Sequence, residues 1–304
     1  GTNLGYDGHG EMNISNEGLV VSNGGSSLGY GETGVGNVSI TTGGMWEVNK
    51  NVYTTIGVAG VGNLNISDGG KFVSQNITFL GDKASGIGTL NLMDATSSFD
   101  TVGINVGNFG SGIVNVSNGA TLNSTGYGFI GGNASGKGIV NISTDSLWNL
   151  KTSSTNAQLL QVGVLGKGEL NITTGGIVKA RDTQIALNDK SKGVVRVDGQ
   201  NSLLETFNMY VGTSGTGTLT LTNSGTLNVE GGEVYLGVFE PAVGTLNIGA
   251  AHGEAAADAG YITNATKVEF GSGEGVFVFN HTNNSDAGYQ VDMLITGDDK
   301  DGKV

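Results

Sequence analysis

Two pairs of charged residues are the strongest candidates for catalysis in this sequence. Arg181 with Asp182, and Arg196 with Asp198, bring carboxylates next to basic side chains, and Lys179 lies close to the first pair. Enzymes that cleave polysaccharides combine such groups in a groove, where they transfer protons. A polysaccharide-degrading enzyme is therefore one function class to consider.

The spacing of these residues argues against a shared site. A glycine-led motif recurs along the chain; Arg181 lies 13 residues after its motif glycine, Gly168, whereas Arg196 lies 3 residues after Gly193. In a stacked repeat fold, equivalent positions lie on the same side and different positions on different sides. We expect the two pairs to face different sides of the molecule, which disfavours catalysis.

Other motifs that resemble binding sites lack required parts. The segment GGNASGKG at 131–138 approximates a phosphate-binding loop, but Gly138 stands where Ser or Thr should hold magnesium, and a strand-like segment follows in place of a helix. The acidic segment DDKDG at 298–302 lacks the spaced ligands and final glutamate of a calcium loop. Three scattered histidines are too few for a metal cage or a catalytic triad. We expect no metal and no cofactor.

Composition narrows the remaining function classes. The 304 residues include 56 glycines, one proline and no cysteine, so disulfides and thiolate chemistry are excluded. The formal net charge of -13 would be repelled by nucleic-acid phosphates and by an anionic membrane surface. The sequence has no run of 18 apolar residues and no basic-then-apolar leader, so we expect it to contain neither a membrane span nor a signal peptide. We expect neither nucleic acid nor direct membrane contact for this chain.

The chain is built from a repeat of about 26 residues. The motif glycine, any residue, apolar, any residue, apolar occurs ten times within residues 10–248. The motif glycines are Gly10, Gly36, Gly62, Gly88, Gly112, Gly138, Gly168, Gly193, Gly217 and Gly244. Their nine intervals average 26 residues, a period typical of stacked repeat folds.

Each repeat contains three strand-like segments and no helical pattern. The residues two and four positions after the glycine are apolar in all ten copies, which predicts a strand with one buried face. A second strand carries an apolar residue ten positions after the glycine, interrupted only by Ser98, and a third ends in an apolar residue followed by glycine. The members of the column at ten are Val20, Trp46, Phe72, Leu122, Trp148, Val178, Leu203 and Leu227. Because Trp46 and Trp148 share this column, we expect both in the core and not as sugar-stacking platforms.

These patterns predict an all-β fold, a right-handed parallel β-helix with three strands per rung. A unit of 26 residues cannot bury its apolar face alone, whereas stacked copies place each apolar residue on its equivalent in the next copy. Parallel crossovers are generally right-handed. A propeller is disfavoured because its blades need about 40 to 45 residues. We expect regular rungs over residues 1–248 and less regular rungs over residues 249–304.

An outward strip of Asn, Ser and Thr follows the first strand of each rung. Asparagine occupies the position three residues after the glycine in seven of ten copies, and mostly Ser or Thr the position five residues after it. The candidate self-association or adhesion face comprises Asn65, Ser67, Asn91, Asn115, Ser117, Asn141, Ser143, Asn171 and Thr173. Two interpretations remain open. The side chains bond to each other along the rod, as polar stacks do in cross-β structures, or they form an adhesive surface whose weak contacts add up.

The sequence resembles the passenger regions of self-associating or adhesive autotransporters, the group that includes antigen 43 and the diffuse-adherence adhesins. The resemblance rests on repeats such as GELNITTGG (168–176), followed by GVFVFNHT (275–282) and ITGDDKDGKV (295–304). It implies a secreted right-handed β-helix on the surface of a Gram-negative cell, with a signal peptide before it and an autochaperone region and outer-membrane β-barrel after it, all three outside this chain. It also implies aggregation, biofilm formation or adhesion to host matrix, without catalysis.

The leading hypothesis is therefore a surface adhesin whose partners are identical passenger domains on neighbouring cells. The alternative is an adhesin that binds host extracellular-matrix proteins or glycans, although the acidic balance argues against sulfated glycans. Four departures from a uniform strip could tune the choice of partner: Met93, Arg196, Asp198 and a lengthened rung that carries KTSSTNAQ (151–158).

Overall fold

The computed structural model describes residues 1–49, 52–151, 158–282 and 294–297, and within these ranges the chain forms strands and turns without any helix. The same ranges accordingly offer no helix of the length and apolarity that a membrane crossing requires. The acidic segment 298–302 and most of the expected loop 151–158 lie outside the described residues.

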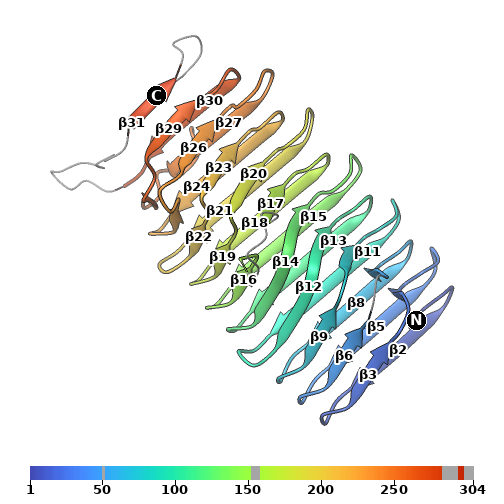
Figure 1. Ribbon diagram of the computed structural model, residues 1–304. Coiled ribbons are helices and arrows are strands. Elements are labelled where there is room, and N and C mark those ends of the chain that lie inside the picture. The colour runs from blue at the N-terminus through green and yellow to red at the C-terminus, as the bar shows by residue number, and fades with distance from the viewer. Residues whose placement is uncertain (50–51, 152–157, 283–293, 298–304) are drawn as a thin grey trace.

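The chain winds into a rod of stacked rungs, as Figure 1 shows. The first strand of every rung belongs to an 11-stranded parallel sheet. Its strands are β2 (His9–Ile14), β5 (Val35–Ile40), β8 (Val61–Ile66), β11 (Ile87–Met93), β13 (Ser111–Ser117), β15 (Lys137–Ser143), β18 (Lys167–Thr173), β21 (Lys192–Asp198), β24 (Thr216–Thr222), β27 (Val243–Gly249) and β30 (Glu274–Asn280). Each of the ten motif glycines pairs with the next along the sheet, and Gly244 pairs with Gly275, an eleventh member. The parallel β-helix and its period are confirmed.

The second and third strands of the rungs share a 20-stranded sheet. The second strands are β3 (Leu19–Ser22), β6 (Met45–Val48), β9 (Lys71–Ser74), β16 (Leu147–Asn149), β19 (Ile177–Lys179), β22 (Leu203–Glu205), β25 (Thr226–Asn228) and β28 (Tyr261–Thr263). The third strands are β1 (Asn3–Leu4), β4 (Ser26–Leu28), β7 (Thr54–Ile56), β10 (Ile77–Leu80), β17 (Leu159–Val162), β20 (Asp182–Ile185), β23 (Asn208–Val211), β26 (Glu233–Leu236), β29 (Lys267–Phe270) and β31 (Leu294–Gly297). Two longer strands, β12 (Ser98–Val106) and β14 (Thr121–Ile130), run through both positions and join the two rows into one sheet.

The predicted apolar columns fill the interior, with one correction. The core position in the second strand is occupied by Phe99 and Leu204, both fully buried, and not by Ser98 and Leu203. The turn before the strand is one residue longer in these two rungs, so the buried residue lies eleven positions after the glycine. A strand alternates its faces with period two, so a shift of one residue exchanges the inward and outward sets.

Both tryptophans are buried, as the column predicts. Trp46 and Trp148 have no solvent exposure, and each indole N–H donates to a serine hydroxyl, at 3.0 Å to Ser22 and 3.2 Å to Ser124. A buried indole that lacks a partner would leave its polar N–H desolvated. A sugar-stacking role for either ring is therefore excluded by its burial.

The outward strip ends where the repeat ends. Between β27 and β28 the chain folds back on the sheet: Asn280 donates to the carbonyls of Ala251 and Glu254 at 2.9 and 3.0 Å. Asn247, expected to point into solvent, is only 1% exposed at this end. The outward Asn column is thus accessible along the regular rungs and closed at the last of them.

Candidate functional surface

Five asparagines on the outward face of the 11-stranded sheet bond to one another along the rod. We call this set the amide ladder: Asn65, Asn91, Asn115, Asn141 and Asn171. Each Nδ2 donates to the Oδ1 of the preceding asparagine, at 2.8 Å for the first three bonds and 3.0 Å for the last. Each internal amide therefore still offers one N–H and one acceptor lone pair to an outside partner.

A second row of polar side chains runs two residues further along the same strands. This hydroxyl row consists of Ser67, Ser117, Ser143 and Thr173, and Met93 interrupts it. Across the part of the chain that the structure describes, no protein group bonds the hydroxyls of Ser67, Ser117 and Ser143. The structure thus brings all nine predicted residues together in two parallel, half-buried rows, which we call the polar face.

Charged residues end the polar face at β21. Arg196 stands in the amide column opposite Asn171 and pairs with Glu169 at 3.2 Å. Asp198 stands in the hydroxyl column and accepts hydrogen bonds from Thr222 and Asn223, both at 2.7 Å. These two residues are engaged in local contacts within the 11-stranded sheet.

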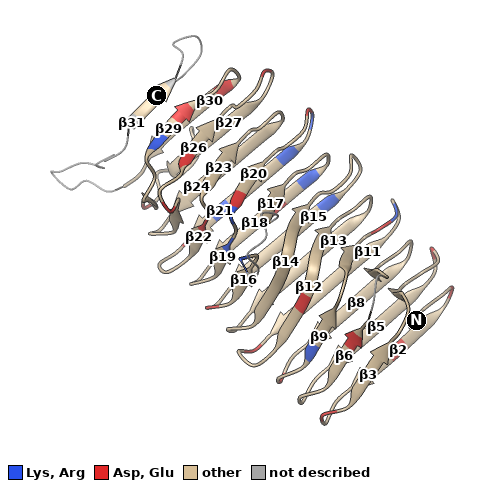
Figure 2. Cartoon of the chain, viewed as in Figure 1, with Lys and Arg blue, Asp and Glu red and all other residues tan. Residues whose placement is uncertain are grey.

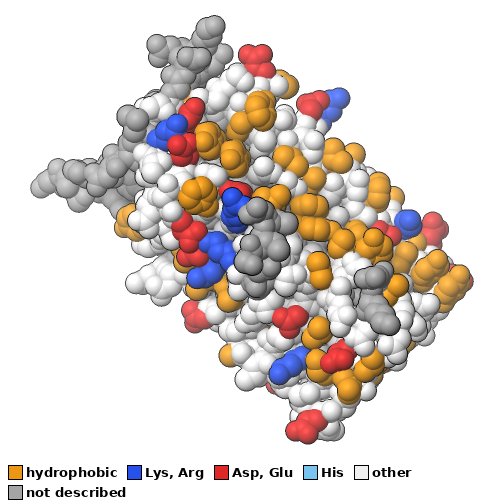
Figure 3. Space-filling model, in the orientation of Figure 1, with side chains coloured by type: hydrophobic (Ala, Val, Ile, Leu, Met, Phe, Trp, Pro, Cys, Tyr) orange, Lys and Arg blue, Asp and Glu red, His pale blue; other side chains and the backbone are white. Residues whose placement is uncertain are grey.

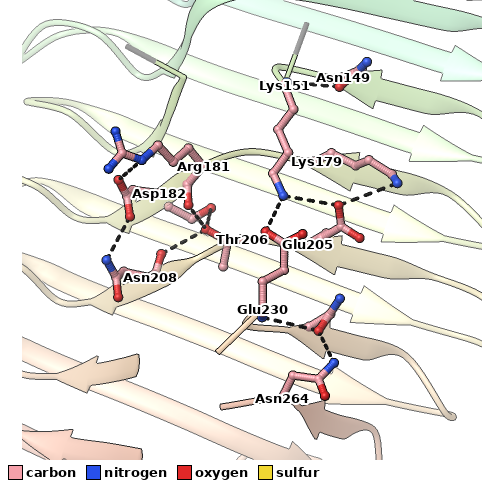
Figure 4. Close-up of polar contacts among 12 residues, drawn as sticks. Asn149, Lys151, Lys179, Arg181, Asp182, Glu205, Thr206, Asn208, Glu230 and Asn264 are labelled. Atoms are coloured by element: carbon pink, nitrogen blue, oxygen red, sulfur yellow. Dashed lines mark hydrogen bonds and ion pairs between the residues drawn. The ribbon is translucent and has the colours of Figure 1, made fainter. Parts of the chain in front are cut away.

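The other candidate catalytic pair lies on the 20-stranded sheet. Arg181 and Asp182 are 3.8 Å apart, and Asn208 donates to Asp182 at 3.0 Å (Figure 4). The prediction that the two charged pairs do not converge is confirmed by this placement.

A charged cluster that the sequence did not reveal lies near Arg181 (Figure 4). Lys151 forms ion pairs with Glu205, at 3.2 Å, and with Glu230, and Lys179 approaches Glu205 at 3.6 Å. These four residues come from four successive rungs, and Lys151 is separated from its partners by 54 and 79 residues. Both carboxylates form ion pairs with lysines of other rungs. The charged cluster therefore links neighbouring rungs to one another. Over the described ranges, no group of three or more His, Asp or Glu residues is placed to hold a metal.

We expect Glu205→Gln to lower the free energy of unfolding by about 1–2 kcal/mol. The Glu205 side chain is 16% exposed, so its loss should cost more than that of an exposed ion pair and less than that of a fully buried one. Urea unfolding at low and high salt measures the change, which should shrink as salt screens the charges. Glu32→Gln, at an exposed position, is the matched control; equal effects of the two variants would contradict a contribution from the charged cluster.

Aromatic rings gather on the outward face of the third strands. Tyr53 contacts Phe79 with ring centroids 5.3 Å apart, Tyr127 stacks on Phe129, and Tyr210 stacks on Tyr235. Figure 3 shows apolar side chains in a broken band along the rod on the viewed face. The hydroxyl of Tyr235 donates to Glu233, and this bond, with burial, raises the pKa of that phenol.

Comparison with known proteins gives a close sequence relative for part of the chain. No family model matches the chain. The uncharacterized lipoprotein YdeK of Escherichia coli (strain K12) is 98% identical over 211 residues, which are 69% of this chain and 16% of that protein. The matched region thus spans about a sixth of the relative's length. A crystal structure of a TibC-catalysed, hyper-glycosylated TibA fragment aligns with 97% of this chain and 94% of its own, at 14% sequence identity and a TM-score of 0.27.

Proposed function

We propose that this rod is a cell-surface adhesion module that associates with a second copy of itself through the polar face. The observation that carries the proposal is a set of available hydrogen-bonding groups that repeats along successive rungs. These groups are the serine hydroxyls of the hydroxyl row and the internal amides of the amide ladder, each of which keeps one N–H and one acceptor lone pair available to a partner. Two copies share the same strand spacing of about 4.8 Å. Once one rung of the first copy pairs with one rung of the second, the polar groups of the following rungs lie opposite one another.

Repetition makes weak contacts useful in this proposal. A hydrogen bond exchanged with water contributes only about 0.5–1.5 kcal/mol. After the first rung has paired, the next rungs pair within the same complex, so their contributions accumulate without a new cost of association. The proposal includes no catalysis, because the clustered carboxylates are held in ion pairs.

The relative and the family resemblance both support a location at a membrane surface in this proposal. YdeK is described as a lipoprotein, and a lipid on the full-length protein would hold the rod at a membrane surface. The resemblance to adhesive autotransporters instead implies a C-terminal barrel in the outer membrane. Adhesion between cells requires that the anchor display the polar face outside the cell, and both this display and the barrel stay predictions.

Charges placed on the polar face should abolish association. In one variant Asn65, Asn91, Asn115 and Asn141 are replaced by Asp; in a second, Ser67, Ser117 and Ser143 are replaced by Asp, which leaves the amide ladder intact. Like charges on facing copies would repel at every rung. We expect cells that display either variant to lose most of their sedimentation by clumping, and the purified serine variant to remain monomeric in analytical ultracentrifugation.

The control carries three Asp residues on the 20-stranded sheet, in place of the outward Ser27, Thr55 and Thr121. It has the same added charge as the serine variant and should clump like the wild type. Unchanged clumping of the folded serine variant would overturn the polar face as the interface. Tight binding of monomeric wild type to a matrix protein or glycan, without clumping, would favour the host-directed alternative.

A further inference from the structure

Three lysines form a row across the N-terminal ends of three neighbouring strands in the 11-stranded sheet. Lys137, Lys167 and Lys192 are the first residues of β15, β18 and β21, and they pair in register, Lys137 with Lys167 and Lys167 with Lys192. Figure 2 shows blue segments recurring on neighbouring strands in the middle of the rod. The spacing of the strands sets the spacing of the lysines at about 4.8 Å. We call this set the lysine row.

The charge of the lysine row is not neutralised within the described residues. None of the three ammonium groups forms an ion pair there. Glu169 lies beside the row, but its carboxylate pairs with Arg196 at 3.2 Å and accepts a hydrogen bond from Asn171 at 3.0 Å. Three like charges at this spacing repel one another, so a bound anion would relieve the repulsion.

The three lysines line one shallow groove. The groove has a volume of about 330 Å³. Ile139, Glu169 and Val194 also line it, as a neighbouring row two residues further along the same strands, so its wall is apolar on either side of Glu169. This volume is at the lower end of small-molecule sites, which span about 300–1,000 Å³. Apolar surface flanked by ammonium groups suits a ligand with an apolar ring face and a carboxylate at the ring edge.

We propose that the lysine row binds an acidic polysaccharide that lies along the rod, with one acidic sugar per rung. A sugar unit in an extended chain is about as long as the strand spacing, so carboxylates recur along the row at close to the spacing of the lysines. Successive carboxylates turn to different sides of the sugar chain, and the flexible four-carbon lysine stems can follow them. Phosphates along one strand of duplex DNA recur about every 3.4 Å along the axis and fall out of register with the lysines. The overall charge of -13 does not prevent binding, because at physiological salt charges beyond about 8 Å are largely screened.

This site is separate from the polar face. The lysine row precedes the amide ladder by four residues on the same strands, or about 13 Å. The inference therefore does not rest on self-association, and each activity can be lost without the other.

Calorimetric titration of the full 304-residue chain with trigalacturonate, galacturonate and a neutral trisaccharide tests the proposal. We expect the acidic trimer to bind far more tightly than the acidic monomer, the neutral trimer not to bind, and added salt to weaken the binding. Each of Lys137→Gln, Lys167→Gln and Lys192→Gln should weaken trimer binding about two- to five-fold, and the triple variant should abolish it.

The matched control is Lys83→Gln with Lys190→Gln, two exposed lysines on turns that should not affect binding. Cell clumping should be unchanged in the triple lysine variant, which separates this site from the polar face. Undiminished binding by the triple variant, equal binding of the neutral trimer, or tighter binding of a double-stranded DNA oligonucleotide than of trigalacturonate would each overturn the assignment.

Discussion

Trp148→Ala is expected to lower the free energy of unfolding by about 3–5 kcal/mol. The Trp148 side chain is fully buried and lies over Gly128, where an added Cβ would be 2.3 Å from the indole ring. Gly128 has no side chain to fill the space, and its backbone is held in register with Leu160 of β17. The substitution therefore leaves a cavity and also removes the partner of the Ser124 hydroxyl.

Trp148 lies in the middle of the rod, so we expect Trp148→Ala to destabilise the rungs next to it more than the rungs at the ends. Stability in a stacked repeat is close to a sum of rung and neighbour terms. Hydrogen exchange should show lost protection in β14, β16 and β19, with protection retained in β2 and β5. Urea unfolding followed by circular dichroism gives the magnitude. Phe207→Ala, at a ring that is 43% exposed, is the control, and a loss as large as that of Trp148→Ala would contradict the assigned role of burial.

Gly168→Ala is expected to destabilise the rod by about 3 kcal/mol, at the upper end of the usual cost of overpacking. A Cβ at Gly168 would be 2.3 Å from the backbone nitrogen of Gly163 and 2.6 Å from the carbonyl oxygen of Ile130. Both contacts are with backbone, which cannot rotate away as a side chain can. The motif glycine is required because the first strand crosses the end of the third at a distance that no other residue permits.

Gly8→Ala provides the control for this prediction, because a Cβ there would meet nothing within 4 Å. We expect its free energy of unfolding to stay within about 0.5 kcal/mol of the wild type. Thermal unfolding of both variants measures the difference. If Gly168→Ala were as stable as Gly8→Ala, the close crossing of strands would not require a glycine at this position.

The period of the repeat predicted the stacking of each rung on its neighbour and the core columns that this stacking produces. The columns at two and four residues after the glycine lie in the core because the spacing from the glycine is constant. The column at ten failed at Phe99 and Leu204, where a longer turn changes the count. The interval between motif glycines already varies from copy to copy. A turn that is longer by one residue therefore cannot be recognised from the interval alone.

The surface was only partly predictable for a related reason. The polar face and the lysine row both follow from aligning the repeats, and the lysines stand one residue before three successive motif glycines. The charged cluster could not be found in this way, because Lys151 and Glu205 occupy different positions in their repeats. Burial of Asn247 depends on a segment with no repeat at all.

The amide ladder also has a direction. Every bond in it runs from the Nδ2 of one asparagine to the Oδ1 of the asparagine before it, so the amide dipoles are parallel and their hydrogen bonds strengthen one another. The ladder thus presents partial positive charge at Asn65 and partial negative charge at Asn171. The next residue in the column beyond Asn171 is Arg196, a cation at the negative end. The positive charge of Arg196 therefore complements the partial negative charge at the end of the amide ladder. A basic residue at the carboxyl end of a helix complements the helix dipole in the same way.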